Sequence, residues 1–181
     1  MSKIVYHGSP NKFAQFSYDS IGDNGTSEGI GFYCTDNKTI AKGYACKNVN
    51  NGYLYTIEFN GKKSLSSDKL TITKAQLKKY LSALQDAGVD FLSNYGDVEY
   101  EGLSHVITEA VNNEYSNNTN DVDLICSICH SSGNIEGCLT ALYKTLHYDS
   151  IVLSAKWGKQ ELYIVLVNKA IKILNIEEVT K

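Results

Sequence analysis

The sequence predicts an α+β fold in which two strand-rich zones flank a helical block. Residues 1–66 and the residues from about 150 onward contain short runs with the β-branched and aromatic enrichment that is typical of strands. Between them, residues 72–148 show apolar side chains at helical spacing. In a chain of 181 residues, this order indicates one domain, 1–181, with the helical block 72–148 inserted into it.

Six strands are expected, three in each strand-rich zone. The clearest is Tyr53–Phe59, because aromatic and β-branched residues dominate it. The loop Tyr18–Glu28 is rich in Gly, Asn, Asp and Ser, and it is long enough to be a functional flap. The predicted strands are Lys3–Tyr6, Gly31–Thr35, Tyr53–Phe59, Ser150–Leu153, Leu162–Val167 and Ala170–Leu174.

The helical block opens with a capping pattern. Thr73 followed by Gln76 predicts a helix start, because each side chain can satisfy a backbone donor of the first turn. Apolar residues then recur at helical spacing up to Gly88, where the helix is expected to stop. Two further helices are predicted over Glu99–Tyr115 and Ile135–Leu146.

The composition narrows the class of function. The formal net charge is −3, which argues against a protein that mainly holds nucleic acid through its phosphates. All 17 basic residues are lysine, so any mechanism that needs a bidentate guanidinium group is excluded.

The sequence also predicts where the protein works. Pro10 ends the first apolar run too early for an export signal, and no stretch approaches the roughly 18 apolar residues of a membrane span. The five cysteines are an odd number without a secretory context, so reduced thiols are expected. We therefore predict no membrane association and a cytoplasmic location, either in the producing cell or after delivery into a host cytosol.

Four short motifs in the strand-rich zones could carry chemistry. Each has a common structural explanation when taken alone: a partly exposed histidine, a glycine turn, core tyrosines and a solvated glutamate. The motifs are His7-Gly8-Ser9 after the first strand, Gly29-Ile30-Gly31-Phe32-Tyr33, Gly43-Tyr44-Ala45, and Gln160-Glu161 before the penultimate strand.

Together and in this order, the motifs resemble the His-Tyr-Glu clan of ADP-ribosyltransferases, which includes diphtheria toxin and the poly(ADP-ribose) polymerases. In that clan a His-Gly-Ser/Thr strand precedes two tyrosines separated by ten residues, as Tyr33 and Tyr44 are, and a glutamate opens a late strand. The resemblance is good over residues 4–9 and 29–46, loose over 150–174, and absent from the helical block. The lack of arginine excludes the sister clan, whose first strand opens with a catalytic arginine.

The resemblance implies a split β-sheet core that binds NAD⁺ as a substrate, with no metal. Glu161 would stabilise the oxocarbenium-like ribose and bind its 2′-hydroxyl. Tyr33 and Tyr44 would sandwich the cationic nicotinamide ring. The backbone of Gly8 would hold the carboxamide, and His7 would bind the adenine-side ribose.

The spacing between the two tyrosines also has a structural reason. Tyr33 ends a strand, and either Asp36 or Asn37 would cap a short helix that brings Tyr44 back to face Tyr33. The full set of residues expected to bind the cofactor is His7, Gly8, Ser9, Gly31, Phe32, Tyr33, Ala41 and Tyr44.

Two departures from the clan pattern have consequences. Ala41 stands where the polymerases have a serine that helps hold the carboxamide, so Ser9 would take more of that role and a single transfer is expected. Leu162 stands between Glu161 and the aromatic Tyr163. Since strand side chains alternate, a slip of one residue would turn Glu161 out of the cleft unless a bulge corrects it.

The loop before Glu161 carries the only tryptophan of the chain. By the resemblance, Trp157 and Gln160 would face the acceptor; in the alternative interpretation Trp157 covers an edge of the core.

A competing motif lies in the helical block. Cys126-Ser127-Ile128-Cys129-His130 matches the string that attaches c-type haem, and Cys138 and His147 could extend it into a zinc cluster. The interpretation we favour is that these cysteines are small buried apolar residues, because the string lies in an apolar, helix-like run.

The sequence therefore predicts a mono-ADP-ribosyltransferase that transfers ADP-ribose from NAD⁺ to a macromolecule. A protein acceptor is expected rather than nucleic acid, and the small size fits a phage or bacterial effector that disables a host or defence protein. The alternatives are an NAD⁺ glycohydrolase and an inert module that binds NAD⁺ or ADP-ribose.

Overall fold

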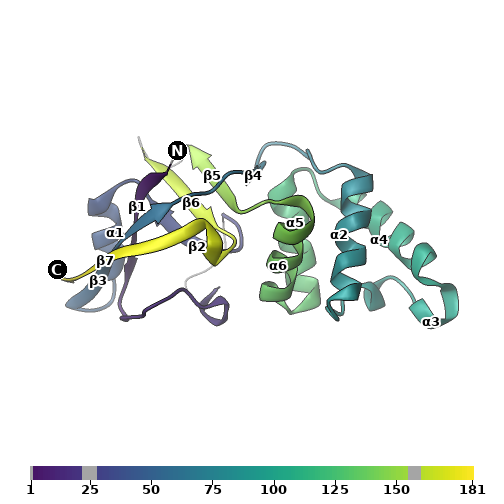
Figure 1. Ribbon diagram of the computed structural model, residues 1–181, viewed down its shortest axis with the longest axis horizontal. Helices are drawn as coiled ribbons and strands as arrows, with labels where there is room; N and C mark the ends of the chain where they lie inside the picture. Colours follow the sequence, from purple (N-terminus) through teal and green to yellow (C-terminus); the bar gives the residue numbers. More distant parts are fainter. Residues whose placement is uncertain (1, 22–27, 155–159) are drawn as a thin grey trace. The chain divides into compact units, whose positions relative to one another are not determined.

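The computed structural model describes residues 2–21, 28–154 and 160–181 (Figure 1). The chain forms two compact units. Met1–Ser64 and Asp149–Lys181 make up the strand-bearing unit, and Leu65–Tyr148 make up the helical unit. Both strand-rich zones of the sequence therefore belong to one unit, and the predicted α+β class is confirmed.

The described strands form one sheet in the order β4-β5-β6-β2-β1-β3-β7. Six of them correspond to the predicted strands, and β4 is new, because two residues are too few to show an alternating pattern. Their bounds are β1 (Lys3–Ser9), β2 (Phe32–Thr35), β3 (Asn51–Phe59), β4 (Ser64–Leu65), β5 (Ser150–Ser154), β6 (Glu161–Val165) and β7 (Ile171–Thr180).

The sheet is interrupted between β1 and β2. On one side, β1 pairs with β3 in an antiparallel register along its whole length, from Lys3 to Ser9. On the other side, β1 pairs with β2 only where Tyr6 meets Thr35. An antiparallel ladder that continued from this pair would place Gly8 opposite Tyr33. This pair is not formed, so the ladder ends after Tyr6 and Thr35. We call the unpaired stretch between Gly8 and Tyr33 the opening between β1 and β2.

The helix α1 (Lys38–Ala45) packs on β1 and β3 (Figure 1). Two glycines allow this close approach. A Cβ atom at Gly8 would lie 1.8 Å from the carbonyl oxygen of Ala41, and one at Gly52 would lie 2.1 Å from that of Ala45. Because both obstacles are backbone atoms, a larger residue at either glycine requires the helix to move away from the sheet.

The opposite face of the sheet is covered by aromatic side chains. Phe16 packs against Phe32 and His7 at ring-centroid distances of 5.0 Å each. Phe13 stacks on Tyr55, with centroids 4.2 Å apart. The short 3₁₀ helices of this unit are Tyr18–Ser20 and Asn168–Ala170.

In the helical unit, α2 packs against both α4 and α6 (Figure 1). The capping box of Thr73 and Gln76 is confirmed at the start of α2. The helix expected over Glu99–Tyr115 is divided, because Gly102 has a φ of 84° and ends the first segment. The helices are α2 (Lys74–Asp86), α3 (Val98–Glu101), α4 (Leu103–Asn117), α5 (Asp121–Ser132) and α6 (Ile135–Leu146), with a 3₁₀ turn at Leu92–Asn94.

A buried carboxylate binds the backbone of the loop that leads into α2. Asp121 is fully buried at the start of α5, and its oxygens accept hydrogen bonds from the backbone N–H groups of Ser66, Thr71 and Ile72. A buried carboxylate persists only when donors satisfy it, so these bonds fix the loop to α5.

In the described part of the chain, no helix is both long enough and apolar enough to cross a bilayer.

We predict that Gly52→Ala lowers the free energy of unfolding by about 1–3 kcal/mol, because α1 must shift to accommodate the new methyl group. Urea unfolding followed by circular dichroism measures this. Gly43→Ala is the matched control, since nothing lies within 4 Å of its added Cβ in α1. This control should stabilise the protein by up to about 1 kcal/mol, as alanine does within helices. Equal effects of the two substitutions would contradict the packing explanation.

Candidate active site

The candidate site lies at the opening between β1 and β2. Beyond Tyr6, no described strand pairs with the side of β1 that faces β2. The strand therefore presents backbone N–H and C=O groups there that need other partners. Gly8 and Tyr33 lie on the two sides of this opening. A planar amide could bind along such an edge as an added strand would.

His7 bridges the opening through its side chain. Its Nδ1 lies 2.7 Å from the carbonyl oxygen of Tyr33, and since a carbonyl can only accept, Nδ1 carries the proton. Burial lowers the pKa of His7, although the bond to Tyr33 acts in the opposite direction. The imidazole is therefore neutral near pH 7, and its Nε2 can accept a hydrogen bond from a hydroxyl group.

Tyr33 and Tyr44 differ in their environments. The Tyr33 hydroxyl donates to the carbonyl oxygen of Gly29 at 2.7 Å, which fixes the half-buried ring to the chain before β2. Tyr44 is 60% exposed on α1, and the Lys47 ammonium lies 5.8 Å from its ring centroid. An exposed aromatic face that already attracts one cation can attract another.

Of the two expected candidates, Asp36 and Asn37, it is Asn37 that caps α1. Its Oδ1 accepts hydrogen bonds from the backbone N–H groups of Thr39 and Ile40, at 3.0 and 3.2 Å. This cap fixes where α1 starts and therefore which turn of the helix carries Tyr44.

The other residues expected to bind the cofactor have mostly structural surroundings. Phe32 was predicted to contact the cofactor, but it is only 5% exposed and packs in the aromatic core, because β2 directs it to the face opposite Tyr33. Ala41 is 2% exposed in the contact between α1 and β1. Gly31 has a φ of 152°, and a Cβ there would lie 2.7 Å from the carbonyl oxygen of Val165. The Ser9 hydroxyl accepts a hydrogen bond from the backbone N–H of Asn11 at 3.1 Å.

Glu161 lies at the first position of β6, within a small polar cluster. Its Oε2 is 3.0 Å from the Lys3 ammonium and also accepts a short hydrogen bond from the Tyr163 hydroxyl. These two contacts, with the bond from Tyr163 the stronger, lower the pKa of the Glu161 carboxyl. The Lys3 ammonium also donates to the Tyr163 hydroxyl at 2.9 Å, and this bond, followed by the contact with Glu161, raises the pKa of Lys3. Glu161 is therefore ionised and already has two partners.

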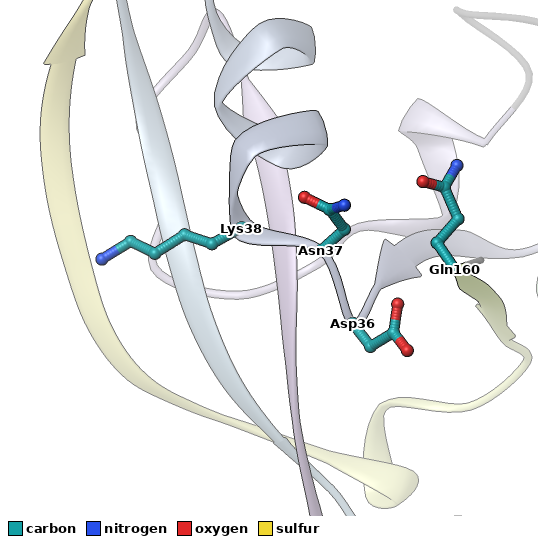
Figure 2. Close-up of a pocket in the computed structure, with 4 residues that line it drawn as sticks. All are labelled: Asp36, Asn37, Lys38 and Gln160. Carbon is teal, nitrogen blue, oxygen red and sulfur yellow. The ribbon is translucent and has the colours of Figure 1, made fainter. Parts of the chain in front are cut away.

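Gln160 lines a polar hollow of about 380 Å³ together with Asp36, Asn37 and Lys38 (Figure 2). The Asp36 carboxylate also accepts a hydrogen bond from the backbone N–H of Glu161 at 3.0 Å, which connects the end of β2 to the start of β6. The prediction that Trp157 faces the acceptor concerns a residue outside the described ranges.

Nothing in the sequence indicated that Lys3 belongs to this site. Asp36 was expected only as a possible helix cap, and Tyr163 only as the aromatic residue that follows the glutamate in the clan pattern. Lys3 lies 158 residues away from Glu161 in the sequence, so no local pattern could associate the two.

The cysteine motif lies on α5. Cys129 and Cys138 are fully buried, and the Cys138 sulfur lies 3.1 Å from the Ser132 hydroxyl. Among residues 2–21, 28–154 and 160–181, no three His, Cys, Asp or Glu side chains are grouped closely enough to hold a metal ion.

The lowered pKa of His7 predicts a pH dependence of stability. Below about pH 6.5, histidine in the unfolded chain takes up a proton that the folded state resists. The free energy of unfolding should therefore fall as the pH decreases from 6.5 to 5, by at most about 1.4 kcal/mol per pH unit from this residue. Urea unfolding at several pH values measures it. His7→Gln, which cannot titrate, should flatten the curve over this range; parallel curves would contradict the assignment.

The comparisons with known proteins identify the family of the chain. No curated protein and no solved structure matches the chain. A family model described as ADP-ribosyltransferase in polyvalent proteins matches residues 1–179, which include both the strands around the opening and the helical unit. The chain thus belongs to the family of ADP-ribosyltransferases in polyvalent proteins.

Proposed function

We propose that this protein is a mono-ADP-ribosyltransferase that uses NAD⁺ to modify a protein acceptor. The observation that carries the proposal is the opening between β1 and β2, where the edge of a glycine-bearing strand lies beside Tyr33. In a chain of this family, that edge is a suitable place for the nicotinamide carboxamide.

The described residues could bind NAD⁺ in the following way. The backbone at Gly8 would pair with the carboxamide, and Tyr33 would provide one face for the pyridinium ring. Tyr44 would provide the other, because its exposed ring can rotate toward a cation. Nε2 of His7 would accept a hydrogen bond from a hydroxyl of the adenine-side ribose.

The chemistry then consists of one substitution at the nicotinamide ribose. The bond between C1 of the ribose and the pyridinium nitrogen breaks, and nicotinamide leaves as a neutral molecule. A nucleophile of the acceptor forms the new bond to C1 and loses its proton where it has one. Aromatic walls favour this step by excluding water from the developing cation.

A single transfer to protein fits the composition of the site. Ala41 brings no hydroxyl to the carboxamide, unlike the serine of the polymerases that the sequence resembles. The net charge of −3 makes nucleic acid a poor partner at physiological salt. We extend the proposal to an effector of a phage or bacterium that acts in a host cytosol.

The activity can be tested by incubating the protein with biotinylated NAD⁺ and cell lysate. Labelled protein bands would support transfer to protein. Nicotinamide release without labelled macromolecules would indicate a glycohydrolase instead, and NAD⁺ binding without release would indicate an inert binding module. Label on nucleic acid alone would contradict the proposed acceptor.

We predict that Tyr44→Ala reduces labelling about tenfold, because it removes one aromatic face from the pyridinium. Initial rates of labelling measure this at a fixed NAD⁺ concentration below saturation. Tyr100→Ala is the matched control, since Tyr100 is an exposed tyrosine of the helical unit, 89% accessible on α3. Equal rates for the two variants would exclude Tyr44 from the cofactor site.

A further inference from the structure

The register between β2 and β6 determines which β6 side chains share a face with Tyr33. Tyr33 pairs with Ile164, and Thr35 pairs with Leu162. Residues directly opposite each other on paired strands direct their side chains to the same face, and successive residues alternate. Leu162 therefore lies on the face of Tyr33, and Glu161 is directed to the opposite face together with Tyr163.

Glu161 is also held in place by its neighbours. The ion pair with Lys3 joins the start of β1 to the start of β6, beyond the point where β2 ends. Two further hydrogen bonds hold Glu161. The Tyr163 hydroxyl donates to its carboxylate, and the backbone N–H of Glu161 donates to Asp36. For this carboxylate to reach the Tyr33 face, all of these contacts must break and the strand must shift by one residue.

The side chain of Gln160 differs from that of Glu161 in its direction and in its contacts. Figure 2 shows its side chain directed to the same side as that of Asn37, at the start of α1. Gln160 directly precedes β6, and extending the alternation of this strand by one residue puts it on the same side, two positions before Leu162. No hydrogen bond from another described residue engages the Gln160 amide, which is half-buried and lines the hollow. Among the described residues, no partner has to be displaced for a ligand to bind this amide.

We propose that Gln160, and not Glu161, is the polar side chain at the start of β6 that contacts the ribose of bound NAD⁺. Its amide oxygen would accept a hydrogen bond from a ribose hydroxyl, and its NH₂ group could donate a second. Glu161 is then a positioning residue that fixes β6 against β1 through Lys3. Leu162 occupies the place beside Tyr33 where a carboxylate would act. This inference rests on the proposed function.

The test uses the full-length protein and two measurements. One is the rate of nicotinamide release from NAD⁺. The other is the Kd of a non-hydrolysable carbocyclic NAD⁺ analogue, which reports contact with the ribose hydroxyls without requiring turnover. The variants are Gln160→Ala, Glu161→Gln and Leu162→Glu, with Gln85→Ala, an exposed glutamine on α2, as the matched control.

We expect Gln160→Ala to raise the Kd of the analogue about tenfold, which corresponds to the loss of one or two hydrogen bonds. Glu161→Gln should leave the Kd unchanged and keep nicotinamide release within about threefold of the wild type, because an amide can still accept from Lys3 and Tyr163. Leu162→Glu should increase release by about tenfold or more, since it places a carboxylate beside the developing cation. Thermal unfolding of each variant verifies that it folds.

Several outcomes would overturn the inference. A loss of release above about 100-fold in Glu161→Gln, with an unchanged analogue Kd and unfolding temperature, would return the catalytic role to that carboxylate. An unchanged Kd in Gln160→Ala would remove Gln160 from the site. If the wild type binds the analogue but releases no nicotinamide, the proposed activity fails while the Kd comparison still decides the role of Gln160. Failure of the wild type to bind would refute both.

Discussion

The early end of the ladder between β1 and β2 is the constraint on which the rest of the candidate site depends. Sheets bury their backbone polar groups by pairing them, and an unpaired edge inside a sheet is tolerated only where water or a ligand can satisfy it. Here the strands part after Tyr6 and Thr35, and the His7 side chain crosses the gap to the Tyr33 carbonyl. That single bond sets the tautomer of the imidazole, and thereby the atom that it offers to a ligand.

The same strand must also accommodate α1. Gly8 meets two requirements at once: its missing side chain lets the backbone of Ala41 approach, and its own backbone borders the opening. Helix packing and the proposed binding of the carboxamide therefore both depend on Gly8. The Asn37 cap and the contact at Gly52 complete the placement of α1. Tyr44 is the part of this arrangement that remains exposed, and the proposed role of its ring against the pyridinium requires this exposure.

On β6, the strand register decides whether a carboxylate or an apolar side chain lies on the same face as Tyr33. A carboxylate and an apolar side chain next to each other in sequence lie on opposite faces of β6, and exchanging them would need only a slip of one residue. The cluster of Lys3, Asp36 and Tyr163 around Glu161 holds one register. Its ion pair is exposed and contributes little by itself, so the backbone bond to Asp36 and the pairing with β2 hold the register more firmly.

The sequence by itself determined the features that depend on neighbours within a few residues. These include the α+β class, the capping box of Thr73 and Gln76, the helix over Ile135–Leu146, and a cap at Asp36 or Asn37 between the two tyrosines. Spacing is preserved along a chain, so the tyrosine pair could be recognised there. Only the tertiary structure decided the order of the strands, the interruption beside Gly8, the core position of Phe32 and the partners of Glu161. Each of these results from contacts between residues far apart in sequence, where the pairing register is set by the packing of the whole sheet and leaves no local pattern.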